Sequence, residues 1–149
     1  MDLAELIARE SVRDLVARYN ANADTGRFDQ AVAVFAEDAV MVVGADRYDG
    51  REEIRGMFAG TRDAIAGQSG DAPAYVRHNT STLQIDVTSP TTAKSRCYFF
   101  VLLDHGLDHW GRYVDAFAEV DGRWVITSRK VTVDGRVPGS MFSPSAERS

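Results

Sequence analysis

Asp24 and His78 are the residues of this chain whose types best suit proton transfer. Asp24 ends a helical pattern whose inner face is otherwise apolar, and His78 is the first of three histidines. A neutral imidazole accepts a proton near neutral pH, and a carboxylate beside it fixes its tautomer. The two residues lie far apart in the chain, so only the fold can bring them together. In contact, they would support acid–base chemistry without a metal or cofactor.

Each of the two residues also has a purely structural interpretation. Asp24 precedes Thr25-Gly26, and Asp-Thr-Gly is typical of solvated turns. A carboxylate near a helix C-terminus is also disfavoured by the helix dipole, by roughly 0.3–1 kcal/mol. His78 shares one strand face with two threonines, while aliphatic residues between Leu83 and Val87 share the other. The alternation alone therefore does not decide whether His78 points inward.

Several further side chains are candidates for the wall of a pocket. Tyr19 lies on the apolar helix face before Asp24, where a buried hydroxyl needs a partner that a substrate can supply. Phe58 lies on the inner side of a predicted third helix. Three strand residues either line the cavity or pack within the sheet, and the pattern leaves both open: Tyr98, Tyr113 and Arg129. Arg112 and Asp115 have the same two interpretations.

The run Asp104-His105-Gly106-Leu107-Asp108-His109 contains two Asp-His pairs, which are potential metal ligands. Gly106 marks a hairpin loop between two predicted strands, so we expect these groups to be solvated and predict no metal site. We also predict no cofactor, because the sequence lacks a phosphate-binding glycine loop, zinc-ligand spacing and a Gly-x-Ser-x-Gly elbow. Cys97 is expected to be an inert core thiol.

The composition limits the partners and the location. The chain has 149 residues, 44% of them hydrophobic, which is enough for one compact domain. A net charge of −5 with scattered basic residues argues against nucleic acid or anionic membrane as a partner. No stretch approaches the roughly 18 apolar residues of a membrane span, and the acidic N-terminus lacks a secretory pattern. A single cysteine excludes an intrachain disulfide and favours the cytoplasm.

The periodicity predicts an α+β fold in a single domain, 1–149, with a core at about 6–133 and a tail at about 134–149. Apolar residues at helical spacing predict a first helix that ends near Gly26. A short second helix at about 29–35 and a third at about 51–66 are expected, with a buried strand at 40–43, a partner strand at 47–50 and a loop at 67–74. Four successive strands follow, at about 75–87, 91–103, 110–120 and 124–133, and their short links imply an antiparallel meander.

The predicted strand at about 91–103 is apolar on both faces. Between Cys97 and Leu103 nearly every side chain is hydrophobic, so both faces of that strand should be covered. Helices can cover only one side of the sheet. We therefore expect a homo-oligomer, either a dimer or a trimer, that buries the other side.

Four motifs, taken in order, resemble the SnoaL-like family of the nuclear-transport-factor-2-like superfamily. They are Phe35-Ala36-Glu37-Asp38-Ala39-Val40, Gly50-Arg51-Glu52-Glu53-Ile54, Arg77-His78 and Asp121-Gly122-Arg123-Trp124. The resemblance runs from about residue 6 to residue 133. It implies a cone-shaped, curved antiparallel sheet wrapped over three N-terminal helices, with a hollow for a small hydrophobic molecule.

The resemblance also implies a chemistry. Catalytic members include scytalone dehydratase, bile-acid 7α-dehydratase, lindane dehydrochlorinase and polyketide cyclases. Asp24 and His78 match the aspartate and histidine that the first three share, and Tyr19 matches a position that is tyrosine or lysine in some members. Two departures stand out. The two dehydratases carry a second ionisable pocket residue where this chain has apolar residues before Asp104, and an asparagine where Tyr113 falls. A simple Asp–His dyad, as in the dehydrochlorinase, fits better.

The expected function is therefore a cofactor-independent lyase or isomerase. His78 would be the base, Asp24 its orienting carboxylate and Tyr19 a donor to developing negative charge. Tyr98, Tyr113, Arg129 and Phe58 would bind the substrate. Two alternatives remain at this point: a non-catalytic binder of a hydrophobic small molecule, and a structural subunit like the small β subunits of ring-hydroxylating dioxygenases.

Overall fold

The computed structural model describes residues 1–69 and 73–142, with only the backbone of residues 68 and 69. Three helices and two short strands precede four long strands. The elements are α1 (Leu3–Asp24), α2 (Phe28–Val32), β1 (Phe35–Val43), β2 (Asp46–Asp49), α3 (Gly50–Ser69), β3 (Arg77–Ser89), β4 (Thr92–Leu103), β5 (Gly106–Val120) and β6 (Arg123–Arg136). The predicted α+β class is confirmed.

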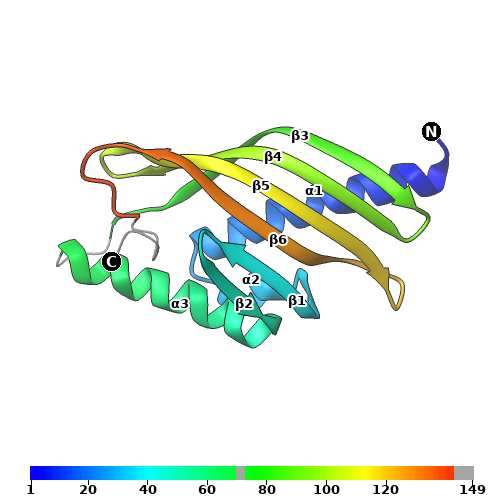
Figure 1. Cartoon of the computed structure of the whole chain (residues 1–149), viewed down its shortest axis with the longest axis horizontal. Helices are drawn as coiled ribbons and strands as arrows, with labels where there is room; N and C mark the ends of the chain where they lie inside the picture. The colour runs from blue at the N-terminus through cyan, green and yellow to red at the C-terminus, as the bar shows by residue number, and fades with distance from the viewer. Residues whose placement is uncertain (70–72, 143–149) are drawn as a thin grey trace.

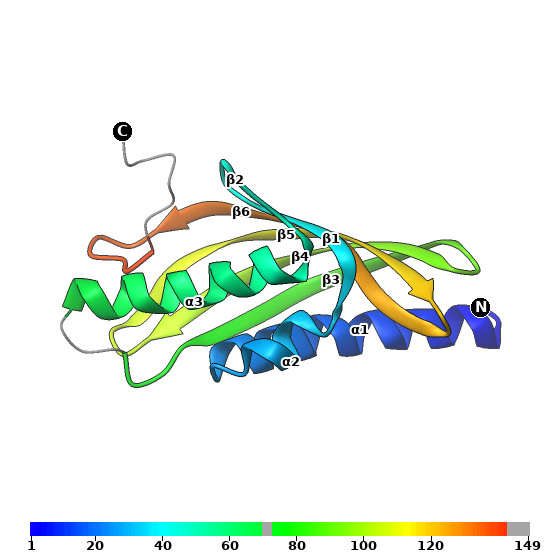
Figure 2. The same cartoon turned by 90° about the horizontal axis from the view of Figure 1, so that it is seen from below.

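The six strands form one curved, open sheet in the order β2-β1-β6-β5-β4-β3. Neighbouring strands are antiparallel except β1 and β6, which run parallel. The helices lie on one side of this sheet, with α1 alongside β3 and α3 beside β1 and β2 (Figures 1 and 2). The other face of the long strands is left without a helix.

The first helix forms as its pattern predicts. The Asp2 carboxylate accepts a hydrogen bond from the Glu5 N–H at 2.8 Å and so caps the N-terminus. The apolar residues at helical spacing are buried, Tyr19 among them. The helix ends at Asp24, and Gly26 has a φ of +73°, the left-handed conformation that terminates many helices. Asp24 therefore lies in the last turn of a helix that is anchored along the sheet.

The predicted second helix at 29–35 is too long. Helix α2 ends at Val32, and Phe35 is instead the first residue of β1, where it pairs with Ile126 of β6. The Phe35 side chain is fully buried and packs edge-on against Tyr19, with ring centroids 5.8 Å apart. Tertiary packing therefore overrides the helical pattern here. The predicted strand at 40–43 is the second half of β1.

A bulge in β3 resolves the ambiguous alternation around His78. His78 pairs with Val101 and Ile85 pairs with Ser95, and both partners face the interior from β4. Seven positions separate His78 and Ile85, which would put them on opposite faces of a regular strand. The register shifts between Ser81 and Gln84, at the residues where Thr82 adopts a φ of +56°. Because the bulge shifts the alternation of side chains by one residue, His78 and Ile85 both face the interior.

Side chains on the two faces of strand β4 differ clearly in burial. Cys97, Phe99 and Val101 are buried on the helix side, while Tyr98 is 56% and Phe100 38% exposed on the other. Burial raises the pKa of the Cys97 thiol to about 11, as expected for an inert core cysteine. The outer face of the sheet is thus apolar at its centre and uncovered in the single chain.

Several predicted segments differ in extent from the structure, most of all α3, β6 and the tail. Helix α3 runs to Ser69, into the predicted loop at 67–74, of which residues 70–72 lie outside the described part. Strand β6 continues to Arg136, into the predicted tail. Residues 137–142 then fold back against β5, because the Val137 N–H donates to the Asp108 carbonyl at 2.9 Å. The rest of the tail, 143–149, is outside the described residues.

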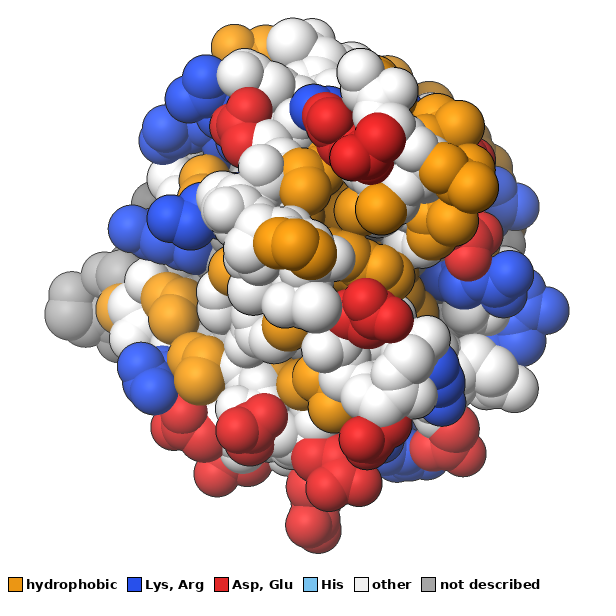
Figure 3. Space-filling model, turned by 90° about the vertical axis from the view of Figure 1, so that its right-hand side faces the viewer, with side chains coloured by type: hydrophobic (Ala, Val, Ile, Leu, Met, Phe, Trp, Pro, Cys, Tyr) orange, Lys and Arg blue, Asp and Glu red, His pale blue; other side chains and the backbone are white. Residues whose placement is uncertain are grey.

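The surface offers no large charged face in the view of Figure 3. Basic and acidic side chains are interspersed around hydrophobic ones at the end of the molecule that carries the N-terminus (Figure 3). There the first turns of α1 expose Leu3, Leu6 and Ile7. None of the helices in the described part of the chain has the length and hydropathy needed to cross a membrane.

Candidate active site

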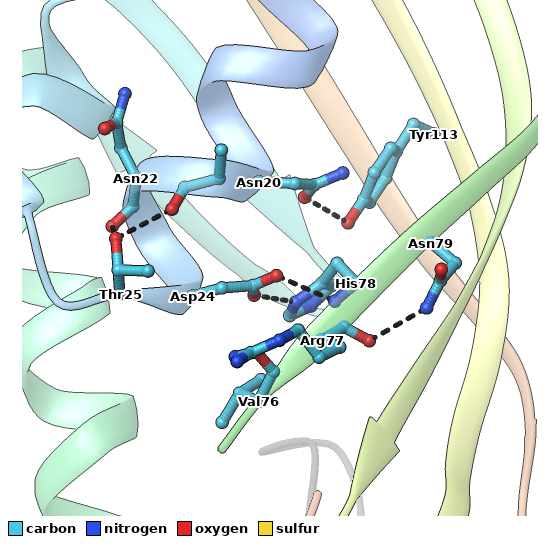
Figure 4. A network of polar contacts seen from close by, with 10 residues as sticks. Asn20, Asn22, Asp24, Thr25, Val76, Arg77, His78, Asn79 and Tyr113 are labelled. Atoms are coloured by element: carbon cyan, nitrogen blue, oxygen red, sulfur yellow. Dashed lines mark hydrogen bonds and ion pairs between the residues drawn. The ribbon is translucent and has the colours of Figure 1, made fainter.

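Asp24 and His78 are in direct contact. The Asp24 Oδ1 lies 2.5 Å from the His78 Nδ1, and its Oδ2 accepts the His78 backbone N–H at 2.8 Å (Figure 4). The Asp24 side chain is 8% exposed and that of His78 is 25% exposed. The carboxylate therefore holds both the ring and the backbone of its partner. A proton on Nδ1, shared with Asp24, leaves Nε2 as the ring atom that can accept a proton.

The local structure explains this contact. Asp24 lies in the last turn of α1, close to the start of β3, so its carboxylate takes the place of a strand partner for the backbone N–H of His78. Two hydrogen bonds from His78 outweigh the unfavourable helix dipole at that position. The turn-acid interpretation of Asp24 does not hold, since the side chain is buried.

Aromatic side chains continue from the pair into the interior. Phe99 lies beside His78, with ring centroids 6.2 Å apart, and stacks on Tyr113 at 4.5 Å. Tyr113 lies edge-on to Tyr19 at 6.1 Å, and Tyr19 contacts Phe58 at 5.6 Å. Three predicted pocket residues therefore lie in one aromatic cluster: Tyr19, Tyr113 and Phe58.

The hydroxyls of this cluster are strongly desolvated. Burial raises the pKa of Tyr19 to about 12, although nearby Arg129 opposes the shift. Burial likewise raises the pKa of Tyr113 well above its usual value, and Tyr19 adds to this effect. The Tyr113 hydroxyl donates to the Asn20 Oδ1 at 3.4 Å (Figure 4). Both tyrosines are therefore hydrogen-bond donors that rarely release a proton at neutral pH.

A buried ion pair lies behind the tyrosines. Arg129 donates to Asp115 through Nε at 2.8 Å and Nη2 at 2.7 Å, and both side chains are 0% exposed. The guanidinium carbon lies 4.1 Å from the ring centroids of both Tyr19 and Tyr113. Burial acts against the charge, but Asp115 holds the pKa of Arg129 above its ordinary value. The Nη1 atom is buried and has no hydrogen-bond partner among the described residues.

Tyr98 is not brought to this cluster. It lies on the outer face of β4, opposite Ser81 and Arg112, and is 56% exposed. Alternation along β4 explains this, because Cys97 and Phe99 on either side of it point into the core. Arg112 is also on the outer face, where it binds Asp134.

A second histidine–carboxylate pair, which the sequence did not single out as a site, lies beside the first. We expected Asp108 and His109 to be solvated in a hairpin loop, and this was wrong: β5 begins at Gly106, Asp108 is 0% exposed and His109 is 8% exposed. The Asp108 Oδ2 accepts from His109 Nδ1 at 2.7 Å. The His109 ring meets the His78 ring edge-on, with centroids 6.4 Å apart.

The described part of the chain contains no group of three or more His, Cys, Asp or Glu residues arranged to hold a metal. A groove of about 590 Å³ runs between α3 and residues 141–142. It is lined by Met57, Gly60, Ile65, Met141 and Phe142, among others. Phe142 stacks on His109 at 4.5 Å, so this aromatic ring separates the groove from the histidines.

Comparison with known proteins gives one family. The sequence profile of the SnoaL-like domain matches residues 4–130. A search among curated proteins found no match.

Solved structures share the fold at low sequence identity. A candidate scytalone dehydratase from Novosphingobium aromaticivorans is 20% identical with a TM-score of 0.77, over 92% of this chain and 91% of that one. Hexachlorocyclohexane dehydrochlorinase LinA-type3 from Novosphingobium barchaimii is 17% identical, with a TM-score of 0.75 over 97% and 99%. A protein of unknown function with a cystatin-like fold, from Nostoc punctiforme, is 22% identical, with a TM-score of 0.75 over 87% and 93%.

Proposed function

Since this chain belongs to the SnoaL-like domain family, we propose that it is a cofactor-independent lyase or isomerase acting on a small hydrophobic substrate. The observation that supports this most directly is the 2.5 Å contact between Asp24 and His78. It gives the imidazole one fixed proton and one free basic nitrogen, as proton abstraction from carbon requires. The neighbouring folds include a dehydrochlorinase and a candidate dehydratase, whose reactions fall in this class.

In this mechanism, His78 Nε2 takes a proton from a carbon next to an electron-withdrawing group. Asp24 stabilises the imidazolium that results. Negative charge then develops on the substrate, and in this proposal the Tyr19 hydroxyl donates a hydrogen bond to it, joined by the Tyr113 hydroxyl when that group gives up its bond to Asn20. The Arg129 guanidinium, whose Nη1 has no hydrogen-bond partner in the described part of the chain, adds positive potential behind them. Burial strengthens these interactions, because little water screens them.

A ketone with a built-in leaving group tests the proposal without knowledge of the natural substrate. 3-(4-Nitrophenoxy)cyclohexanone loses 4-nitrophenolate once a proton is removed beside its carbonyl, and the release is visible by absorbance. We expect the protein to accelerate this release, and Asp24→Asn to lower kcat/KM by about 10²-fold or more. The asparagine amide donates to Nδ1, which moves the ring proton to Nε2 and removes the base.

Asp104→Asn is the matched control. Its carboxylate also bonds backbone N–H groups, those of Ala74 and Tyr75, but it lies outside the site. It should retain wild-type kcat/KM. Equal activity of the Asp24→Asn and wild-type proteins would contradict the mechanism. Binding of the ketone with no release above the buffer rate would mark the protein as a non-catalytic binder.

We also propose that the outer face of the sheet joins copies of this chain. Phe100 and Trp110 are neighbours across β4 and β5, and both are more than a third exposed, as are Tyr98 and Val114. A second copy would cover this apolar surface. Light scattering should therefore give a multiple of 16.4 kDa for the wild type and about one chain for Phe100→Lys. Thr88→Lys, exposed near the end of β3, is the control. A monomeric wild type would refute this assembly.

A further inference from the structure

His78 and His109 occupy one row across three strands. His78 pairs with Val101, and Val101 pairs with His109 on the next strand. Directly opposed residues point to the same face of a sheet, and Val101 is buried on the helix side. Both imidazoles therefore face the interior, and their ring centroids are 6.4 Å apart. Both rings also contact Phe99, at 6.2 and 6.0 Å.

His109 has the same hydrogen-bonding pattern as His78. Its Nδ1 faces a buried carboxylate, Asp108, at 2.7 Å. Asp108 also accepts from the Ser140 hydroxyl at 2.7 Å and from the Met141 N–H at 3.0 Å. A carboxylate held by several donors stays ionised and keeps the ring proton on Nδ1. Among the described residues, nothing bonds the Nε2 of either histidine, so each presents that atom for proton transfer.

The charged neighbours of His109 come from four elements. Asp108 precedes it on β5, and His105 lies 3.0 Å from Asp108 in the preceding turn. His78 faces it from β3 with Asp24 of α1 behind, and Arg136 is opposite on β6. Burial lowers the pKa of His109 and the charge of His78 lowers it further, although Asp108 opposes both. The pKa of Asp108 stays below its usual value: burial acts to raise it, but bonds from Ser140, Met141 and His109 outweigh burial.

The proposed reaction leaves one proton transfer unassigned. When the leaving group is a poor one such as hydroxide, it needs a proton as its bond to carbon breaks. Tyr19 and Tyr113 hold their protons too tightly for this, because burial raises their pKa values. Arg129 remains charged. A protonated His109, whose lowered pKa makes it a stronger acid than an ordinary imidazolium, is suited to the task.

We propose that His109 is a second proton-transfer residue of this site, which gives a proton to a departing hydroxyl while His78 takes one from carbon. This inference rests on the proposed function and assigns it a substrate class, β-hydroxy carbonyl compounds. The proton beside the carbonyl passes to His78 Nε2, and the electrons of that C–H bond form the new C=C bond. The C–O bond breaks, its electron pair stays on oxygen, and His109 Nε2 protonates that oxygen to give water. Proton return from His78 to His109 through a water molecule restores the pair.

Two probes that differ only in their leaving group test this role. 3-Hydroxycyclohexanone and 3-(4-nitrophenoxy)cyclohexanone share the same acidic carbon, but 4-nitrophenolate leaves without a proton. His109→Asn keeps an amide N–H near the position of Nδ1, and so keeps the bond to Asp108, but removes Nε2. It should lower kcat/KM for the hydroxy ketone by about 10²-fold or more and change little for the nitrophenoxy ketone. His78→Asn should impair both.

The pH dependence of kcat/KM provides a second test, because its shape would not change if His109 had only a structural role. With the hydroxy ketone, kcat/KM of the wild type should depend on pH as a bell-shaped curve. When His78 and His109 are both protonated the site lacks a base, and when both are neutral it lacks an acid. With the nitrophenoxy ketone, only the limb that rises with pH should remain. His105→Asn is the matched control, since His105 also contacts Asp108 but is 41% exposed and outside the row. It should keep both profiles.

The three histidines can also be followed directly by ¹H–¹⁵N NMR during a pH titration. We expect His78→Asn to raise the pKa of His109, because a neighbouring positive charge is lost. An unchanged His109 titration, or equal losses on both probes in His109→Asn, would overturn the second proton-transfer role and leave the proposed function standing. Full activity of His78→Asn on the nitrophenoxy ketone would overturn the proposed function itself. A wild type inactive on both probes would overturn the substrate class.

Discussion

A His78→Asn protein should lose about 10²–10⁴-fold in kcat/KM for release of 4-nitrophenolate from 3-(4-nitrophenoxy)cyclohexanone. The loss is expected because no other group can take the proton from carbon: His109 is directed to the leaving group, and the tyrosines are not bases at neutral pH. The fold should be unaffected. The asparagine amide still reaches the Asp24 carboxylate, and the backbone N–H of residue 78 still donates to Asp24 Oδ2.

Thermal unfolding and a control variant separate chemistry from folding. The melting temperature of His78→Asn should stay close to that of the wild type, as should that of His105→Asn, which also keeps wild-type activity. An active His78→Asn protein would refute the base. A protein that is inactive because it no longer folds would show a lower melting temperature, and the comparison would then move to His78→Gln.

The second large effect concerns stability. Asp115→Leu should lower the free energy of unfolding by about 3–5 kcal/mol, because it leaves the Arg129 charge buried without its partner. For a domain of this size the melting temperature should fall by about 10 °C. Asp134→Leu removes the partner of Arg112 in a pair whose side chains are 51% and 40% exposed, and it should cost less than about 1 kcal/mol.

A double variant separates the structural and electrostatic roles of this ion pair. Asp115→Leu with Arg129→Met replaces two buried charges with apolar side chains of similar size, which is often neutral for stability. We expect it to recover most of the melting temperature of the wild type. It should not recover activity, since positive potential behind Tyr19 and Tyr113 is lost. Recovery of both would remove Arg129 from the mechanism.

The sequence predicts the framework of this site well. Helical spacing places Tyr19 on the inner face of α1 and Asp24 at its end, and four motifs in order identify the family. These features depend on local periodicity and on short motifs, which a single sequence displays directly. The sequence supports the contact between Asp24 and His78 only as a hypothesis, because the contact depends on how α1 lies along β3.

The residues that sequence reasoning missed depend on register. The direction of His78 is set by a bulge at Thr82, and no simple alternation reveals such a bulge. His109 is buried because β5 already begins at Gly106, before Asp108 and His109, and because residues 137–142 fold back over it. Gly106 correctly marks the turn but not how short it is. The one available signal was the adjacent Asp-His pair itself.

The double hold of Asp24 on His78 has a consequence for comparing relatives. One carboxylate oxygen serves the imidazole, while the other ties the end of α1 to the start of β3. A descendant that abandoned the chemistry would still gain stability from that hydrogen bond, so purifying selection would retain the aspartate after its catalytic use had ended. The histidine ring takes no part in that backbone hydrogen bond. Divergent homologues that keep an aspartate at the position of Asp24 but have no histidine at that of His78 should therefore be those that no longer catalyse the reaction and retain the fold.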